Sequence, residues 1–192
     1  VVFGENIETI GQSAFFGCTS LNNITIPEGV TSIGGRAFGN CNSLNTITFN
    51  AVNCVNMVTM ENNVRYIGAN AFTHCDALVR INSDVDGVIN LPSGVTYIGS
   101  GAFYDCDNIT TIDIPSGVTR IENMTFDSCS RLRNVTLPSG VTYIGLQAFN
   151  LCAFSAFTIP SSVTEIGLGA FEGCCNLKSI TIPSGVTSIG NQ

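Results

Sequence analysis

Apolar and polar positions along this chain follow a pattern that returns about every 23 residues. In a clear copy, Ile26-Pro27-Glu28-Gly29 is followed by Val-Thr-x-Ile-Gly, Ala-Phe-x-x-Cys and Leu-x-x-Ile, and most copies end in Leu-x-x-Ile-x-Ile or a close variant of it. A fixed period of this size predicts a solenoid, because each unit is too small to bury a core alone and must stack on its neighbours. One isoleucine marks each copy: Ile10, Ile33, Ile67, Ile98, Ile121, Ile144, Ile166 and Ile189.

Each unit predicts three short elements. In Leu-x-x-Ile-x-Ile, the signature of a leucine-rich repeat, alternation buries Ile24 and Ile26 and exposes Asn23 and Thr25, as a strand requires. Val-Thr-x-Ile is short and rich in β-branched residues, which predicts a second strand or extended segment. Gly-x-x-Ala-Phe-x-x-Cys is too short for a stable helix, so we expect a single α or 3₁₀ turn that closes the coil.

Two copies are lengthened by insertions near residues 50–63 and 82–90. The first is apolar, and we expect a hairpin packed on the sheet edge or a contact surface for a partner. In the second, Asp86-Gly87 between Val85 and Val88 predicts a hairpin. Its spacing of Asn and Asp also resembles half of a calcium loop, but Ser93 stands where the bidentate glutamate should be, which favours the hairpin.

The repeated string Ile-Pro-Ser-Gly-Val-Thr-x-Ile-Gly-x-x-Ala-Phe-x-x-Cys-x-x-Leu-x-x-Ile resembles the BspA-like (Treponema pallidum-type) leucine-rich repeat family over nearly the whole chain, from Phe3 to Gly190. The resemblance implies a surface or secreted protein that adheres or binds partners, and it does not imply catalysis. We therefore expect one β-rich, right-handed, curved solenoid of about eight coils over residues 1–192, with a parallel sheet on its concave side.

Composition narrows the choice of partner. Only 11% of the 192 residues are charged and the net charge is −7, with 7 basic residues scattered singly. This argues against nucleic acid and against an anionic membrane surface, and no apolar run is long enough for a membrane helix. The chain opens and closes within a unit, so we expect a piece of a longer array whose uncapped ends permit end-to-end self-association.

Seven of the nine cysteines share one position in the repeat. Rungs of a parallel sheet lie about 4.8 Å apart, but parallel Cβ vectors make a disulfide torsion hard to reach, so we expect free, buried thiols. Cys54, in the first insertion, is the best candidate for a reactive thiol, and one of the vicinal Cys174-Cys175 pair should face outward. The shared position contains Cys18, Cys41, Cys75, Cys106, Cys129, Cys152 and Cys174.

Catalytic and metal chemistry are not indicated. A zinc site needs about four converging ligands, and a column with one cysteine per coil does not supply them. His74 is the only histidine, and we interpret it as a solvated side chain. The 14 acidic residues are spread singly, without an evident acid/base pair. We expect no enzyme activity, no cofactor and no metal.

The exposed strand positions are the predicted binding surface, because their side chains differ from coil to coil while the buried positions keep the same residue types. The expected partner is an extracellular or host protein or a glycan. A structural spacer in a longer surface protein is the alternative, and binding of ice by the threonine columns is a minor one. The candidate residues are Asn23, Thr25, Thr46, Thr48, Arg80, Asn82, Thr111, Asp113, Asn134, Thr136, Ser179 and Thr181.

Overall fold

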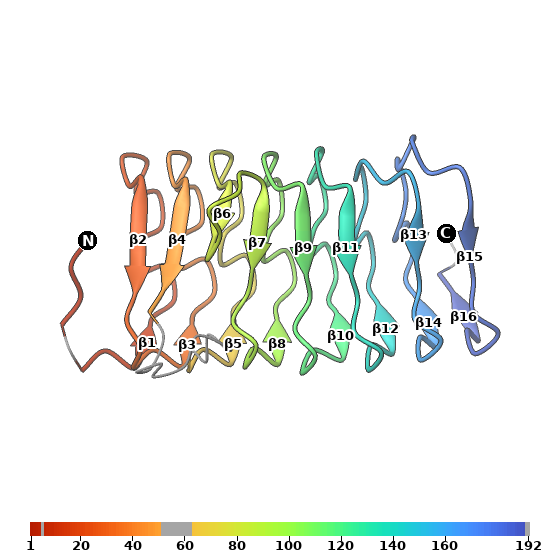
Figure 1. The fold of residues 1–192 in the computed structure, drawn as a ribbon, viewed down its shortest axis with the longest axis horizontal. Helices are drawn as coiled ribbons and strands as arrows, with labels where there is room; N and C mark the ends of the chain where they lie inside the picture. The colour runs from red at the N-terminus through yellow and green to blue at the C-terminus, as the bar shows by residue number, and fades with distance from the viewer. Residues whose placement is uncertain (5, 51–62, 191–192) are drawn as a thin grey trace.

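The computed structural model describes residues 1–4, 6–50 and 63–190. The predicted hairpin of the first insertion and the predicted reactive thiol of Cys54 fall at residues 51–62, outside the described residues. The described chain winds into a β-solenoid of about seven turns, with its coils side by side in one row (Figure 1). About seven complete turns therefore lie between the first and the last of the eight copies of the repeat.

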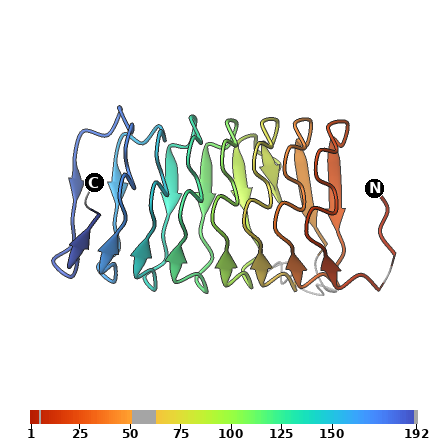
Figure 2. The ribbon, with the colours of Figure 1, turned by 180° about the vertical axis from the view of Figure 1, so that it is seen from behind.

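Two rows of parallel strands form two faces of the solenoid (Figures 1 and 2). The long-strand face contains β2 (Asn23–Ile26), β4 (Thr46–Phe49), β6 (Arg80–Ile81), β7 (Val88–Asn90), β9 (Thr111–Asp113), β11 (Asn134–Thr136), β13 (Phe157–Thr158) and β15 (Ile180–Thr181). The short-strand face contains β1 (Thr9–Ile10), β3 (Ser32–Ile33), β5 (Tyr66–Ile67), β8 (Tyr97–Ile98), β10 (Arg120–Ile121), β12 (Tyr143–Ile144), β14 (Glu165–Ile166) and β16 (Ser188–Ile189).

The predicted alternation within the long strands is confirmed. In β2, Asn23 and Thr25 are exposed while Ile24 and Ile26 are buried, and each residue lies opposite its counterpart in β4. Because the side-chain period of a strand is two, this register stacks the isoleucines of successive coils inside the solenoid. The predicted strand at Val-Thr-x-Ile is confirmed as well, as the two-residue strands of the short-strand face.

Phenylalanine rings stack along the axis of the solenoid. Phe126 lies between Phe103 and Phe149, with ring centroids 5.5 and 5.6 Å away and interplanar angles of 5°. The stack continues in both directions to Phe15 and Phe171, which are only partly buried. The period of the chain thus places one large apolar ring per coil in the core.

The third side of each coil, which we call the turn face, is not helical. The α or 3₁₀ turn expected at Gly-x-x-Ala-Phe-x-x-Cys is wrong: in the described residues these segments are successive turns without a helix. Each contains two residues with positive φ, such as Arg36 (55°) and Asn40 (59°). Successive backbone N–H groups alternate between a hydrogen bond within the segment and one to the next coil. Ala37 N donates to Gly34 O, whereas Phe38 N donates to Ala71 O at 2.8 Å.

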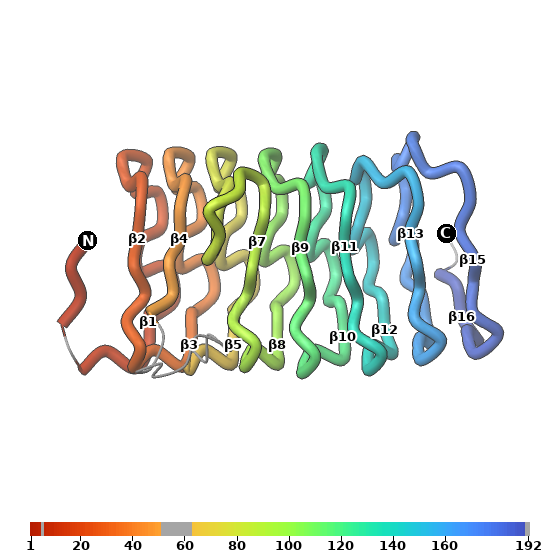
Figure 3. The backbone as a smooth tube through the Cα atoms, in the orientation of Figure 1, coloured from red at the N-terminus to blue at the C-terminus, as the bar shows by residue number. Residues whose placement is uncertain are grey.

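This alternation explains why no helix forms. A helix would use every backbone N–H inside its own segment, whereas here every second one joins two coils. Successive coils consequently follow the same backbone path (Figure 3). The close approach also accounts for the glycine that begins the segment, since a Cβ on Gly68 would lie 2.5 Å from the backbone nitrogen of Gly35.

The second insertion adds a strand rather than a hairpin. β7 pairs with β6 in parallel register, with Arg80 opposite Val88 and Ile81 opposite Ile89, so the predicted antiparallel hairpin is wrong (Figure 1). A turn does occur at Asp86-Gly87, where Gly87 has a φ of 82° and Val88 N donates to Val85 O. The turn carries the chain back to the start of β6, and the chain then repeats the strand in the same direction.

Candidate functional site

The twelve predicted binding residues lie together on the long-strand face, and each is at least partly exposed. They form two rows, with about one side chain per coil in each row. The first row is Asn23, Thr46, Arg80, Thr111, Asn134 and Ser179. The second row is Thr25, Thr48, Asn82, Asp113, Thr136 and Thr181.

Sequence reasoning missed three members of these rows: Thr158, which lies opposite Thr181, and two residues of the insertion, which was assigned to a hairpin. Val88 lies between Arg80 and Thr111 in the first row, and Asn90 lies opposite Asp113 in the second. The signal was present, because Val88-Ile89-Asn90 repeats the x-Ile-x alternation of the other strands.

An open hollow of about 300 Å³ lies on this face where β4 and β6 meet. Its lining is Thr46, Thr48, Phe49, Arg80, Asn82, Ser83 and Asp84. Asn82 joins the strands around it: its side-chain oxygen accepts from Phe49 N at 2.7 Å, and its side-chain nitrogen donates to Asn90 O at 3.4 Å. Because these bonds tie three neighbouring strands together, the polar groups of the hollow sit on a stiff base.

One exposed ion pair borders the hollow. Arg80 donates from Nε to Asp86 Oδ1 at 2.7 Å, and its Nη2 lies at the same distance from that oxygen. Exposed pairs of this kind add little stability, so both charges remain available to a ligand. Together with the surrounding hydroxyl and amide groups, the pair suits hydrogen bonding to a polar partner.

The short-strand face carries a row of rings that sequence reasoning missed. Tyr66 and Tyr97 stack with centroids 4.8 Å apart, and the Arg120 guanidinium lies 3.9 Å from the ring centre of Tyr143. These residues all occupy the variable position of Val-Thr-x-Ile, which was the available signal. Tyrosine and arginine are frequent in the energetic centres of interfaces, so this row is a competing contact surface.

The threonine column beside that row uses its hydroxyls internally. Thr142 Oγ1 donates to Thr119 O at 3.3 Å in the preceding coil, and Thr164 and Thr187 make the same contact. Donors engaged in this way do not form a free hydroxyl array, which weakens the ice-binding alternative.

Six column cysteines, called the column thiols below, are buried and free. Each Sγ donates to the carbonyl of the phenylalanine one coil earlier, as from Cys129 to Phe103 O at 3.1 Å. Burial raises the thiol pKa throughout the column, to about 11 for Cys41 and Cys174. The column thiols are Cys41, Cys75, Cys106, Cys129, Cys152 and Cys174.

The prediction of free, buried thiols is confirmed for these six. Cys18, the first of the column, is exposed instead because no earlier repeat covers it in the described chain. Cys175 is exposed as well, as predicted for one member of the vicinal pair.

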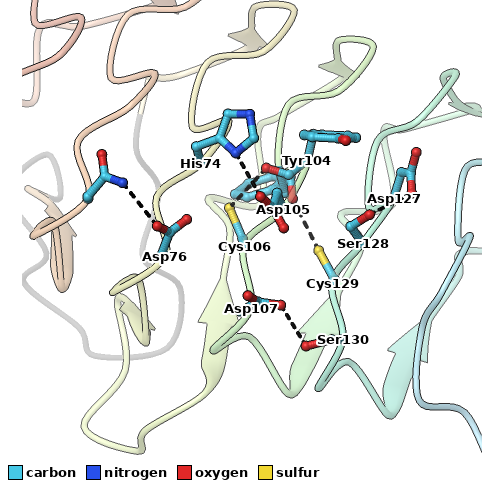
Figure 4. Close-up of polar contacts among 12 residues, drawn as sticks. His74, Asp76, Tyr104, Asp105, Cys106, Asp107, Asp127, Ser128, Cys129 and Ser130 are labelled. Atoms are coloured by element: carbon cyan, nitrogen blue, oxygen red, sulfur yellow. Dashed lines mark hydrogen bonds and ion pairs between the residues drawn. The ribbon is translucent and has the colours of Figure 1, made fainter.

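On the turn face, His74 is not the isolated solvated side chain that the sequence indicated. Its Nδ1 lies 2.7 Å from Asp105 Oδ2, although 43% of the His74 side chain remains exposed (Figure 4). Asp76 lies beside this pair, and ligand atoms of the three residues lie within 4.8 Å of one another. In the sequence they look like single scattered residues, because Asp105 comes from a different coil than His74 and Asp76.

Comparisons with known proteins agree with the architecture. The family model described as "BspA type Leucine rich repeat region (6 copies)" matches residues 1–84, 49–174 and 144–192. No curated protein matches the chain. Within the described ranges, no helix has the length and apolar character needed to cross a bilayer.

Solved structures resemble the chain along most of its length. A leucine rich cell surface protein from Faecalibacterium prausnitzii is 34% identical over 99% of this chain, with a TM-score of 0.76. The chain spans only 46% of that protein. The T. pallidum leucine rich repeat protein is 26% identical, with 76% of this chain and 70% of that protein covered and a TM-score of 0.50. The pneumococcal vaccine antigen PcpA, at 17% identity and a TM-score of 0.54, covers 97% of this chain and shares the fold through 64% of its own.

Proposed function

Because this chain belongs to the family of BspA-type leucine-rich repeat proteins, we propose that it is a recognition module of a cell-surface or secreted protein. It binds an extracellular or host protein, or a glycan, through the long-strand face. The leucine-rich repeat solenoid is a non-enzymatic type of scaffold, and the F. prausnitzii relative is a cell surface protein.

One observation carries this proposal: exposed polar side chains stand in two rows that run from coil to coil along a parallel sheet. The backbone beneath them is held by hydrogen bonds on all three sides of each coil, so the rows are presented at fixed spacings. Preorganised donors and acceptors lose little conformational entropy on binding. The hollow beside Arg80 is one place on this face where a ligand group can be partly enclosed, and a second hollow lies beside Thr136 and Thr158.

Binding by one module is weak. The described long-strand face has few charges and no large exposed aromatic side chain in its two rows, and such side chains supply most interface energy. Useful strength then comes from many copies on one surface, because linked sites bind with a high effective concentration.

The experiment compares monomeric protein with protein coupled to beads. Both are tested on immobilised collagen, fibronectin and laminin and on a glycan array. The double variant Arg80→Ala/Asp113→Ala should weaken retention of the beads at least tenfold with nearly unchanged thermal unfolding, because both side chains are exposed or partly exposed.

The matched control is Tyr97→Ser on the short-strand face. If Tyr97→Ser removes binding and the double variant does not, the row of rings is the contact surface and the long-strand proposal is wrong. Native protein that binds none of these probes would instead favour the alternative function of a structural spacer.

A further inference from the structure

We propose that His74, Asp76 and Asp105 form a binding site on the turn face for a first-row divalent metal ion such as Zn²⁺. The proposal is independent of the recognition function, since none of these residues belongs to the two long-strand rows. One imidazole nitrogen and two carboxylate oxygens lie within 4.8 Å of one another, close enough to converge on one ion with small side-chain movements.

The backbone holds two of the ligands in equivalent places. His74 and Asp105 each precede a column cysteine in successive coils, and both have left-handed backbones, with φ of 53° and 57°. His74 N donates to Tyr104 O, and Asp105 N donates to Asp127 O, both at 2.9 Å. Since these bonds belong to the ladder between coils, the spacing between the two side chains is set by the solenoid itself.

Neighbouring side chains orient the ligands. The Tyr104 ring meets the imidazole of His74 edge-on, with centroids 5.3 Å apart. Asn42 Nδ2 donates to Asp76 Oδ2 at 3.0 Å, which leaves the other carboxylate oxygen of Asp76 free to coordinate. Outer partners of this kind fix ligand direction, and their loss commonly weakens metal sites about 10–100-fold.

The carboxylates around the trio favour a cation, and the nearby positive charge is that of Arg36, which lines the same hollow as His74. Asp107 and Asp127 stand near Asp105, and the proximity of all three helps to raise the pKa of the Cys129 thiol after burial, its main cause. Among the described residues, the only ion pair made by these carboxylates is the one between Asp105 and His74. A bound dication would therefore offset negative charge that no lysine or arginine of the described chain pairs with.

An open hollow of about 490 Å³ adjoins the site, with His74 and Tyr104 in its lining and with Phe16 and Met124 also contributing. Three protein ligands leave coordination positions for water or for a ligand group that enters from this hollow. Thus the site has the form of an open metal site rather than a closed structural one.

The donor set selects the class of metal. Imidazole nitrogen with carboxylate oxygen suits Zn²⁺ and its first-row neighbours, whereas Ca²⁺ and Mg²⁺ prefer oxygen ligands alone. In the metal-free state a proton bridges His74 Nδ1 and Asp105 Oδ2. The metal ion takes its place, and both atoms donate electron pairs to the metal. The displaced proton is balanced by the other ring nitrogen: a neutral imidazole takes up a proton at Nε2 as Nδ1 loses its own, whereas an imidazolium, already protonated at Nε2, releases the Nδ1 proton to solvent.

Because His74 is the only histidine, NMR of its ring nitrogens reports on this site alone, provided that the protein has no affinity tag. Zn²⁺ should shift the Nδ1 signal with saturation at one equivalent, and Ca²⁺ or Mg²⁺ at the same concentration should not. This readout also separates the site from Zn²⁺ binding at the exposed thiols of Cys18 and Cys175. Ring signals that Zn²⁺ leaves unmoved, or that Ca²⁺ moves equally, would overturn the proposal.

Calorimetric titration of Zn²⁺ tests the ligands one by one, in a background where Cys18, Cys54 and Cys175 are serine. His74→Asn keeps the left-handed backbone favourable, as Asn40 does at the same place one coil earlier, and should weaken affinity at least tenfold. Asp105→Asn should do the same. Asp107→Asn is the matched control, because Asp107 bonds to Ser130 and lies outside the trio, and it should change affinity less than threefold. Affinity that survives His74→Asn would assign the metal to an acidic patch and refute the site.

Discussion

Replacing Phe126 with alanine is the most direct test of how this solenoid is held together. The side chain is fully buried and lies between two parallel rings, those of Phe103 and Phe149. Its removal opens a cavity in the middle of the stack, and the ladders on all three sides hinder the neighbouring coils from moving in to fill it.

The expected loss in the free energy of unfolding is about 3–5 kcal/mol, the range for removing a buried phenylalanine from a core that relaxes little. Loss of two ring contacts, worth about 0.5–1.5 kcal/mol each, places the value toward the upper part of that range. Phe171→Ala should cost less, because Phe171 lies near the end of the described chain and is only partly buried.

The measurement is a denaturant titration followed by circular dichroism, and Phe16→Ala is the control. Phe16 is 47% exposed, so its replacement should change stability by no more than about 0.5 kcal/mol. A loss below about 1 kcal/mol for Phe126→Ala would refute the argument that the ring stack is a rigid core. Equal losses for Phe126→Ala and Phe16→Ala would refute it as well.

Three further predictions concern the thiols and the added strand. In the native state a thiol reagent should modify Cys18 and Cys175 and leave the column thiols until denaturation, and rapid modification of all of them would contradict their burial. Because burial raises the pKa of the column thiols above 9.0, the thiols of the unfolded chain ionise first as the pH rises. The free energy of unfolding should therefore stay constant below about pH 8 and fall above pH 9 by up to about 1.4 kcal/mol per pH unit for each thiol. Urea titrations should show a shallower fall for Cys129→Ala. Gly87→Ala should lower the free energy of unfolding by about 1–3 kcal/mol, because Gly87 has a positive φ. In the control Gly140→Ala the added Cβ meets no atom within 4 Å, so the change should be less than about 0.5 kcal/mol. Equal effects of the two variants in thermal unfolding would count against the turn described before β7.

The proposed recognition face could be located largely from sequence, although its content could not. The period of two within Leu-x-x-Ile-x-Ile identifies which side chains point outward, and the repeat identifies which of them share a row. Val88 and Asn90 were missed because Asp86-Gly87 is a strong local signal for a hairpin. A local turn signal gives no direction for the strand that follows, and here contacts with β6 and β9 decide that direction.

For the cluster of His74, Asp76 and Asp105 on the turn face, the sequence indicates the positions but not the contacts. Repeat alignment does place His74 and Asp105 at the same position in successive coils, 31 residues apart. Whether two such side chains meet depends on the left-handed backbone at both positions, which the expected helical turn would have replaced. Asp76 lies beside them, and Asn42 from the preceding coil donates a hydrogen bond to its carboxylate.

The columns of this protein can be derived from its repeat pattern. A period of about 23 residues places like residues at the same point of every coil, and a small unit must bury its apolar members against its neighbours, so the phenylalanine, isoleucine and cysteine columns follow from pattern and burial alone. Contacts between coils set the other features: the turns without a helix, the parallel insertion of β7 and the meeting of His74 with Asp76 and Asp105. These depend on hydrogen bonds and side-chain contacts between coils, which form after the chain has wound and which no local stretch of sequence encodes.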